Sequence, residues 1–402
     1  MILQSKRVWV LNDWLEAQIQ FSERTGRIEG IYPYGDREAD QDYGDLRIVP
    51  GFIDVHTHGA YGFDTNDADE EGLRDWLKKV VSEGVTGILP TTITQSEEVL
   101  TAALRNVAKV ARRQQEDRAA RRQEAASGRR SAPEEVPGAR ILGIHLEGPY
   151  LDREYKGAQP ERFCVPPDLD QFKRYLEASD GLIRIVTLAC EHDEGYRLTR
   201  FLSEKGIVPS LGHSSATCGQ AAMAFANGAR SVTHVYNGMA PFHHREPGIP
   251  GASFRFSNVY GEIICDGLHS GWAAVNAFFT SKGPDYGIMI SDSLRVKGLA
   301  AGTEAFFGGN RIELYEDGSA HLADSGKLAG STMKMNEGLR NLVEKAGVPW
   351  QTAINSCTLN PAGLLGLDRA KGSIQTGKDA DLVVLRDDYS VEAVFAGGKR
   401  YF

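Results

Sequence analysis

Two histidines spaced two residues apart constrain the fold of this chain more than any other sequence feature. They end an apolar run, Val49-Pro50-Gly51-Phe52-Ile53-Asp54-Val55-His56-Thr57-His58. Residues i and i+2 of a β-strand project to the same face, so the side chains of His56 and His58 can meet at the end of a strand. Neutral imidazole is the commonest protein ligand for divalent transition metals. An isolated His-x-His pair can also merely cap a strand, and the remaining sequence decides between these interpretations.

Apolar runs of strand length recur after residue 48 and alternate with segments of helical pattern. Eight such runs occupy residues 49–58, 85–92, 141–149, 183–190, 207–213, 231–234, 261–266 and 287–292. Continuous apolar runs are typical of parallel strands that are buried on both faces. Eight of them with helical spacers predict an α/β fold of the (β/α)8 TIM barrel type. We therefore expect residues 49–359 to form a barrel domain.

The two ends of the chain have a different pattern. Residues 1–48 alternate apolar and polar positions, with turn signals at Asn12-Asp13 and Thr25-Gly26, which predicts short antiparallel strands. Residues 372–374 and 380–385 also have strand character, and a β-hairpin is expected within residues 311–322. We expect residues 1–48 and 360–402 to pair into one small β-sandwich domain.

The spacer between the second and third runs predicts a helix that begins after Ser96. Its apolar positions recur at helical spacing: Leu100, Leu104, Val107 and Ala111. Residues 112–130 are rich in Arg, Gln, Glu and Ala and lose this stripe, so a solvated helix extension and a loop are expected there. Basic and acidic residues are interleaved in this segment, which disfavours a nucleic-acid role.

Composition limits the class of protein. A chain of 402 residues can bury one large barrel and a smaller domain, and a formal net charge of -9 argues against nucleic acid as the main partner. No stretch approaches the length of a membrane span, and the first residues contain no apolar run typical of a signal peptide. We therefore expect a cytoplasmic protein without a membrane partner. The five cysteines lie far apart without a Cys-x-x-Cys pair, so neither a disulfide framework nor a zinc-thiolate site is indicated.

Side chains with ligand or acid/base chemistry stand at the ends of these runs: His56, His58, Glu147, His213, His234, His269 and Asp292. Active sites of TIM barrels are built at the carboxyl ends of the strands. Three or fewer imidazoles with one carboxylate per ion leave an open position for water, which becomes a nucleophilic hydroxide near neutral pH. Asp292 can accept a proton from that water and return it to a leaving amine. The pattern predicts a metal-dependent hydrolase in which Glu147 binds one ion or bridges two.

Several motifs together resemble the N-acetylglucosamine-6-phosphate deacetylases of the amidohydrolase superfamily. They lie at residues 50–58, 145–149, 212–214, 234–239, 245–248, 266–269 and 291–292, and the similarity continues at 360–362 and 377–382. The His145-Leu146-Glu147-Gly148-Pro149 run is the most informative of them. Many relatives in the superfamily have a carboxylated lysine nearby in the site, whereas this family uses glutamate.

The resemblance implies a role for each residue of the site. Glu147, His213 and His234 would hold a tightly bound divalent ion, and His56 and His58 would complete a second site. Zinc, iron, manganese and cobalt all suit these ligands. Asp292 would be the general acid/base, and Arg245 and His269 would contact the sugar phosphate, with a homodimer in which the neighbouring subunit can supply such contacts. The residues expected to touch the substrate are Gly148, Gln159, Asn237, Gly238, Arg245, His269 and Leu328.

The implied reaction converts N-acetyl-D-glucosamine 6-phosphate into D-glucosamine 6-phosphate and acetate by attack of metal-held hydroxide, in amino-sugar metabolism. Gln159 departs from the family pattern, because many relatives have a histidine there that polarises the acetamide carbonyl. Glutamine can donate an N–H to that oxygen but cannot supply a charge. The alternatives are an N-acetylgalactosamine-6-phosphate deacetylase, a cyclic-amide hydrolase or, from another class, a non-catalytic barrel scaffold.

Overall fold

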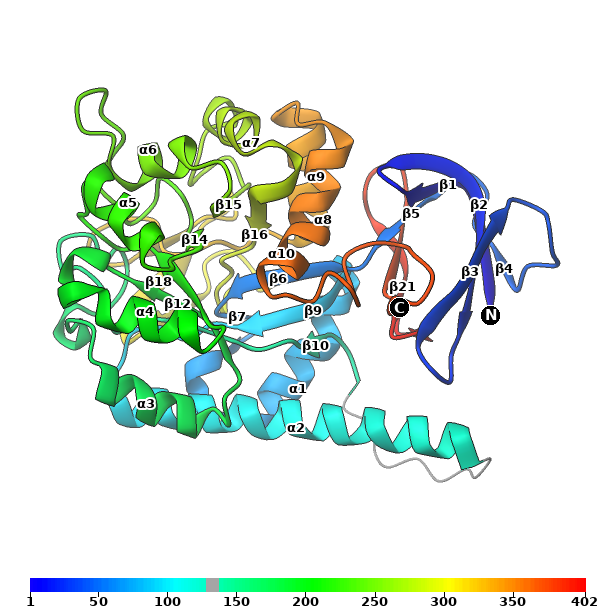
Figure 1. Ribbon diagram of the computed structural model, residues 1–402, viewed down its shortest axis with the longest axis horizontal. Coiled ribbons are helices and arrows are strands. Elements are labelled where there is room, and N and C mark those ends of the chain that lie inside the picture. The colour runs from blue at the N-terminus through cyan, green and yellow to red at the C-terminus, as the bar shows by residue number, and fades with distance from the viewer. Residues whose placement is uncertain (128–136) are drawn as a thin grey trace.

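The computed structural model describes residues 1–127 and 137–402, with side chains for 1–120 and 137–402. A large α/β part lies beside a β-rich part in which both chain termini are found (Figure 1). None of the helices in these residues combines the length and the apolar character that crossing a bilayer requires.

Parallel strands form the centre of the α/β part, at the positions expected from the apolar runs. They are β6 (Phe52–Thr57), β9 (Val85–Pro90), β11 (Ile144–Glu147), β12 (Ile183–Leu188), β13 (Val208–Leu211), β14 (Ser231–Val232), β15 (Tyr260–Ile264) and β16 (Gly287–Ile290). Strands β11 to β16 pair in sequence order, and β6 pairs with β9, which also pairs with the short β10 (Arg140–Ile141). A parallel bridge between Thr91 and His145 links the two sheets. The Asp292 N–H donates to the His56 carbonyl (2.9 Å), so the first and last strands of this curled layer are neighbours.

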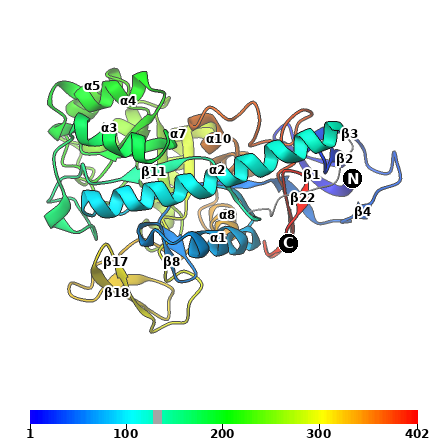
Figure 2. The same cartoon turned by 90° about the horizontal axis from the view of Figure 1, so that it is seen from below.

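Helices cover the outer side of these strands. They are α1 (Glu70–Lys79), α2 (Glu97–Ser127), α3 (Leu169–Ala178), α4 (Arg197–Glu204), α5 (Cys218–Ala226), α6 (Gly248–Arg255), α7 (Trp272–Tyr286), α8 (Met335–Arg340), α9 (Trp350–Cys357) and α10 (Leu359–Leu364). The stripe expected on α2 is buried throughout. Beyond the stripe α2 continues toward the β-rich part (Figure 2), where Arg118 lies 2.7 Å from Asp379. The last part of the expected extension, residues 128–130, lies outside the described residues.

Both ends of the chain contribute strands to one sheet, as the sequence predicts. Its strands are β1 (Ile2–Val10), β2 (Asp13–Ser22), β3 (Arg27–Pro33), β4 (Gln41–Asp42), β5 (Arg47–Pro50), β20 (Leu382–Leu385), β21 (Val391–Ala396) and β22 (Lys399–Arg400). The order is β22-β21-β20-β5-β1-β2-β3, with β4 beside β1. The expected strand at residues 372–374 is wrong, because Gly372 has φ 83°, a left-handed conformation in which a strand cannot continue. The antiparallel prediction is also incomplete, because β4 and β5 both pair with β1 in parallel.

The hairpin expected after the last parallel strand is present and carries one additional strand. Strands β17 (Glu304–Phe307), β18 (Asn310–Leu314) and β19 (Ala320–Leu322) form an antiparallel sheet. Figure 2 shows β17 and β18 projecting away from helices α3 to α5. A second small antiparallel pair, β7 (Gly59–Ala60) and β8 (Phe63–Asp64), follows the His-x-His strand.

Candidate metal centre

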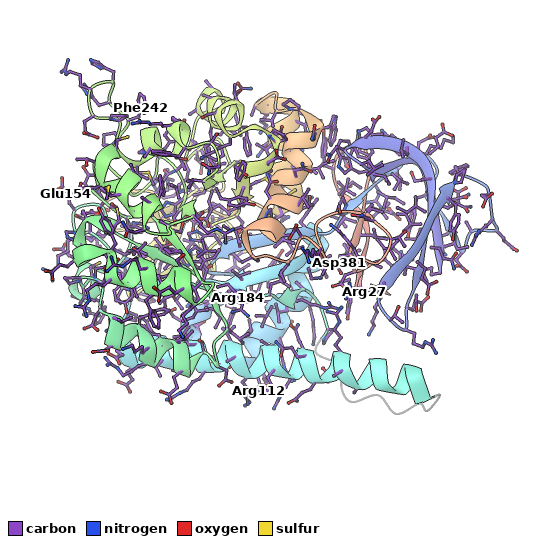
Figure 3. The ribbon with its side chains drawn as sticks, viewed as in Figure 1. Arg27, Arg112, Glu154, Arg184, Phe242 and Asp381 are labelled. Carbon is purple, nitrogen blue, oxygen red and sulfur yellow. The ribbon has the colours of Figure 1, made fainter. Side chains whose placement is uncertain are left out.

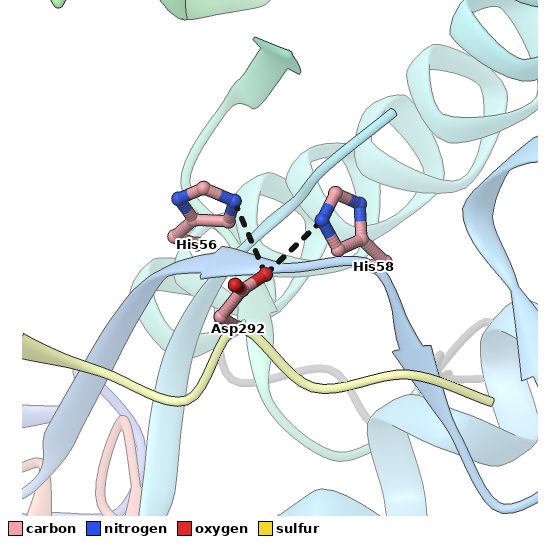
Figure 4. A group of neighbouring side chains, drawn as sticks. All are labelled: His56, His58 and Asp292. Carbon is pink, nitrogen blue, oxygen red and sulfur yellow. Dashed lines mark ion pairs between the residues drawn. The ribbon is translucent and has the colours of Figure 1, made fainter. Parts of the chain in front are cut away.

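His56 and His58 lie at the carboxyl end of β6 and turn their rings toward Asp292, which follows β16 (Figure 4). The Nε2 atoms of His56 and His58 lie 3.4 and 3.2 Å from the same Asp292 Oδ1. The period of two along the strand puts both rings on one face, and the adjacency of β6 and β16 supplies the carboxylate. All three side chains are buried.

A second group of buried ligand-type side chains surrounds Glu147, the last residue of β11. Glu147 Oε1 lies 3.3 Å from His213 Nε2 and 3.0 Å from His234 Nε2. The same carboxylate also approaches the first group, since Oε1 is 3.4 Å from His56 Nε2 and Oε2 is 3.2 Å from His58 Nε2. Glu147 therefore stands between the two histidine pairs and can bind one ion or bridge two.

The four imidazole rings all present Nε2 to this centre, because each Nδ1 has a partner of its own. These partners are Glu262 Oε2 for His56 (3.0 Å), the Thr91 carbonyl for His58 (3.3 Å), the Tyr155 carbonyl for His213 (2.8 Å) and the Asn237 carbonyl for His234 (3.0 Å). A carbonyl can only accept, so Nδ1 of His213 and His234 carries the proton and Nε2 presents a lone pair. These two Nε2 atoms are 3.1 Å apart, and His56 Nε2 is buried without a hydrogen-bond partner. Converging lone pairs beside a carboxylate fit a divalent cation.

The electrostatics of the cluster also favour a cation. Burial alone would raise the pKa of the Glu147 carboxyl, but the charge of His56 and hydrogen bonds from His213 and His234 hold that pKa well below its usual range. Burial likewise opposes ionisation of Asp292, yet His56 and His58 lower its pKa. Burial would lower the pKa of His58, but its contacts with Asp292 and Glu147 raise it to about 9. Two buried carboxylates therefore stay ionised and attract positive charge.

Metal binding is expected to release protons. With a pKa of about 9, the His58 imidazole carries at pH 7 a proton that must leave before Nε2 can bind an ion. Protons therefore compete with the metal below pH 9, and the apparent affinity should rise as the pH increases from 7 to 9. Calorimetric titration of zinc into the metal-free protein, in two buffers of different ionisation enthalpy, counts these protons. Zero protons released at pH 7 would contradict this expectation, and His58→Asn is the control that should release fewer.

The ligand cluster opens into a cavity that brings together most of the residues expected to touch a substrate. It is lined by His58, Glu147, Gly157, Ala158, Gln159, His213, His234, Asn237, Gly238, His269, Asp292, Phe307, Leu328 and Gly330. Gly238 has φ 59°, and a Cβ at this position would lie 2.7 Å from His213 Nδ1. Only glycine therefore allows the chain to pass so close to the two ring ligands.

His269 adds a positively charged group to the cavity wall. Its Nδ1 lies 2.7 Å from Asp266 Oδ2. Burial lowers the pKa of His269, but the hydrogen bond and the charge of Asp266 outweigh it and raise the pKa above the usual value. A protonated imidazole in this position suits an anionic substituent such as a phosphate.

Gln159 makes contacts that the sequence does not predict. Its Oε1 accepts the Thr94 N–H (2.7 Å), and its Nε2 donates to Glu147 Oε2 (2.8 Å). The first contact determines the orientation of the amide, so its N–H side faces the ligand cluster. One Nε2 hydrogen is directed at Glu147 and the other is left for a substrate carbonyl, so Gln159 also orients a metal ligand.

Two of the expected substrate residues do not line the cavity. Gly148 packs against Thr94, since a Cβ at position 148 would lie 1.9 Å from Thr94 Oγ1. Arg245 belongs to the exposed loop 241–247, which Figure 3 shows projecting at Phe242, and its Nη1 lies 3.2 Å from His244 Nε2. Arg245 is therefore accessible to a second molecule and is not directed at the cavity of its own chain.

The sequence analysis does not identify two residues that complete the site. Glu262 contacts the far side of the His56 ring, and the signal for it was a charged residue within the apolar run 261–266. Phe307 ends β17, lines the cavity and packs edge-on against His58 with ring centroids 5.3 Å apart. No local pattern could place Phe307, because its strand belongs to the projecting hairpin.

Nearly the whole chain is similar to known proteins. It matches the amidohydrolase family over residues 47–154 and 205–401. An N-acetylglucosamine-6-phosphate deacetylase of Bacillus subtilis (strain 168) is 39% identical over 358 residues, which cover 89% of this chain and 85% of that protein. An N-acetylgalactosamine-6-phosphate deacetylase of Escherichia coli O157:H7 is 31% identical, with 99% and 98% covered.

The fold has equally extensive matches. A mutant N-acetyl-D-glucosamine-6-phosphate deacetylase from Mycobacterium smegmatis, solved in complex with N-acetyl-D-glucosamine-6-phosphate, matches with a TM-score of 0.87 and 30% identity. The match covers 100% of this chain and 99% of the other. The resemblance expected from the sequence is thereby confirmed, and the chain belongs to the amidohydrolase family.

Proposed function

We propose that this protein hydrolyses N-acetyl-D-glucosamine 6-phosphate to D-glucosamine 6-phosphate and acetate, as a metal-dependent deacetylase of amino-sugar metabolism. The observation that carries the proposal is a single cavity that combines the ligand cluster around Glu147, the carboxylate of Asp292 and the cationic ring of His269. The names of the similar proteins support the same substrate class.

The residues divide into ion-binding and proton-transfer roles. Glu147, His213 and His234 would hold one divalent ion, and His56 and His58 would complete a second site, with zinc, iron, manganese or cobalt as candidates. When bound, such an ion polarises the acetamide carbonyl and lowers the pKa of water. Asp292 takes the proton that the nucleophilic water loses and delivers it to the departing amine.

The remaining residues orient the substrate. Gln159 donates its free N–H to the acetamide oxygen, Asn237, Gly238 and Leu328 form the sugar wall, and His269 pairs with the phosphate. We also assign Gly148 to the substrate site through its backbone. Arg245 would reach a phosphate in the cavity of a neighbouring subunit, which requires the expected homodimer.

The domain organisation and location remain part of the proposal. We propose a (β/α)8 barrel over residues 49–359 and a β-sandwich built from 1–48 and 360–402. The curled parallel sheet and the shared terminal sheet support this division. Helix α10 stands at the boundary, and its Ala362 and Leu364 pack with Ile53 of β6. A cytoplasmic location stays a prediction from the sequence.

Proton NMR of the reaction mixture tests the function. Metal-loaded protein with N-acetyl-D-glucosamine 6-phosphate should produce acetate and the free amine in equal amounts. N-acetyl-D-galactosamine 6-phosphate is the matched comparison, because one relative bears that name. Faster turnover of the galactosamine compound would replace the proposed substrate with its epimer. No acetate from either compound, with metal bound, would favour a cyclic-amide hydrolase.

Replacing Phe307 with alanine is expected to relax the limit on acyl chain length. Phe307, Ala158 and Leu328 are the apolar side chains that line the cavity, and Phe307 is the one beside the ligand His58. A methylene in a pocket is worth about 10- to 200-fold in discrimination. We expect the ratio of kcat/KM for the N-butyryl to the N-acetyl substrate to rise at least about 10-fold. The control is Phe306→Ala, because the preceding side chain is exposed; equal ratios in both variants would exclude Phe307 from the acyl site.

Replacing Asp266 with asparagine is expected to weaken phosphate binding above neutral pH. Asp266 keeps His269 cationic, and without this carboxylate the pKa of His269 falls, so the ring loses its charge at a lower pH. A hydrogen bond to a charged group contributes about 1.5–3 kcal/mol, which corresponds to about 10- to 100-fold in affinity. KM for the phosphorylated substrate should therefore begin to rise at lower pH in the variant than in the wild type. Superimposable profiles of KM against pH would show that His269 does not hold the phosphate.

A further inference from the structure

Glu262, on β15, is a buried carboxylate that the reaction proposed above does not use. Its side chain is 0% exposed. Oε2 accepts a hydrogen bond from His56 Nδ1 at 3.0 Å, and Oε1 is buried without a hydrogen-bond partner. Burying an ionised carboxylate is costly unless a counter-charge or several hydrogen bonds compensate. Within residues 1–120 and 137–402, the ion pairs of Glu262 involve His56 alone.

The neighbouring His145 does not supply the missing compensation. Its Nδ1 donates to the Val55 carbonyl (3.0 Å), and its Nε2 accepts from the Thr187 hydroxyl (2.8 Å). Burial holds the pKa of His145 well below its usual value, so the ring is neutral. The charge of Glu262 therefore acts on the cluster through the His56 ring.

His56 is distinguished from the other three ring ligands by this partner. The Nδ1 atoms of His58, His213 and His234 face backbone carbonyls, whereas Nδ1 of His56 faces a carboxylate. A carboxylate behind a histidine fixes its tautomer and orientation and makes Nε2 a more basic ligand. The opposite nitrogen, His56 Nε2, points at Glu147 and Asp292 and has no hydrogen-bond partner.

The charge balance of the cluster points in the same direction. Glu147 and Asp292 carry two negative charges, which balance one divalent ion. A second divalent ion adds two positive charges to a buried region, where an uncompensated charge is costly. Glu262 offers a third negative charge next to His56, on the side of the cluster formed by His56, His58 and Asp292.

We propose that Glu262 is a positioning residue that stabilises a second divalent ion at His56, His58 and Asp292, so that the protein binds two ions per chain. This inference rests on the proposed function, since it takes the cluster to be the metal centre of a hydrolase. The group of Glu147, His213 and His234 has backbone carbonyls behind its rings and would keep its ion without Glu262.

Two variants test the role of the charge. Glu262→Gln keeps an acceptor for His56 Nδ1 and removes the charge. Glu262→Met removes both in a similar volume and leaves no buried charge, so the variant is expected to fold. Each protein is loaded with zinc, dialysed against a graded series of chelator concentrations, and its metal content and melting temperature are measured. The wild type should retain two ions, and the second ion should be lost at about 10- to 100-fold lower chelator strength in the variants. Cobalt-loaded samples should lose the part of the visible absorption spectrum that His56→Asn also removes.

The outcomes separate this inference from the proposed function. Two ions held with wild-type affinity in both variants would overturn it, as would loss of both ions from a folded variant or failure of the methionine variant to fold. A single ion in the wild type would also overturn it, while acetate release by that protein would leave the proposed function standing. Two ions in the wild type without any acetate release would remove the proposed function and leave the role of Glu262 intact.

Discussion

Replacing Asp292 with asparagine is expected to lower kcat for deacetylation by about 10²- to 10⁴-fold, the range that general acid/base catalysis contributes. Asparagine has nearly the same shape but cannot accept the proton of the nucleophilic water or return it to the amine. Asp292 Oδ1 lies 3.2 Å from His58 Nε2, and the side chain is buried, so no bulk water can replace it as the proton carrier. Steady-state kinetics on the metal-loaded variant measures the effect.

The control for this variant is its metal content. The group of Glu147, His213 and His234 does not include Asp292, so Asp292→Asn should retain at least that ion and a melting temperature close to that of the wild type. A variant that retains metal and turns over within 10-fold of the wild type, as an order-of-magnitude threshold, would exclude Asp292 as the acid/base.

Replacing Glu147 with glutamine is expected to remove most of the bound metal and the activity with it. Glu147 lies within 3.4 Å of the Nε2 atoms of all four ring ligands, so its charge serves both ion positions. Losing the polarising ion removes several kcal/mol of transition-state stabilisation, and about 4 kcal/mol corresponds to about 10³-fold in kcat/KM. Metal analysis and kinetics on the same preparation measure both effects.

The matched control is Glu154→Gln, the same chemical change at an exposed position (Figure 3). It should leave metal content and kcat/KM at the wild-type level. If Glu147→Gln kept a full complement of metal, Glu147 would not be a ligand, and an unchanged kcat/KM would exclude it from the site altogether.

The arrangement of the parallel strands could be predicted from the sequence because it depends on local pattern. Each continuous apolar run became a strand, and the ligand-type residues that follow β6, β11, β13, β14 and β16 meet in one cluster because parallel strands share a carboxyl edge. The pairing of the two chain ends was also predictable, since the strand-like pieces outside the barrel region have unsatisfied edges that only each other can complete.

Other parts of the site depend on contacts between distant segments and had no local signal. The carboxylate of Glu262 acquires its role because β15 places it behind the His56 ring. Phe307 reaches His58 only because the hairpin of β17 and β18 folds back on the cavity. The amide of Gln159 is oriented by the Thr94 backbone, which a reading of residues 156–159 alone cannot supply.

Local backbone conformation explains the remaining differences. Gly372 adopts a left-handed conformation, so the expected strand at 372–374 does not form. His213, His234 and Asp292 also have positive φ values of 48°, 28° and 47°. Non-glycine residues in this region are strained and concentrate at functional sites. The strain is a property of the folded loops, and the sequence shows only that these residues end strands.

The ratio of kcat/KM for N-acetyl-D-glucosamine 6-phosphate to that for unphosphorylated N-acetyl-D-glucosamine tests the proposed activity most directly. Both compounds carry the same acetamide, so the ligand cluster and Asp292 act on them alike, and only the phosphate differs. Charge-assisted contacts to that phosphate predict a ratio of at least about 10²-fold in favour of the phosphorylated sugar. A ratio near one would contradict the assignment of the cavity to a sugar phosphate.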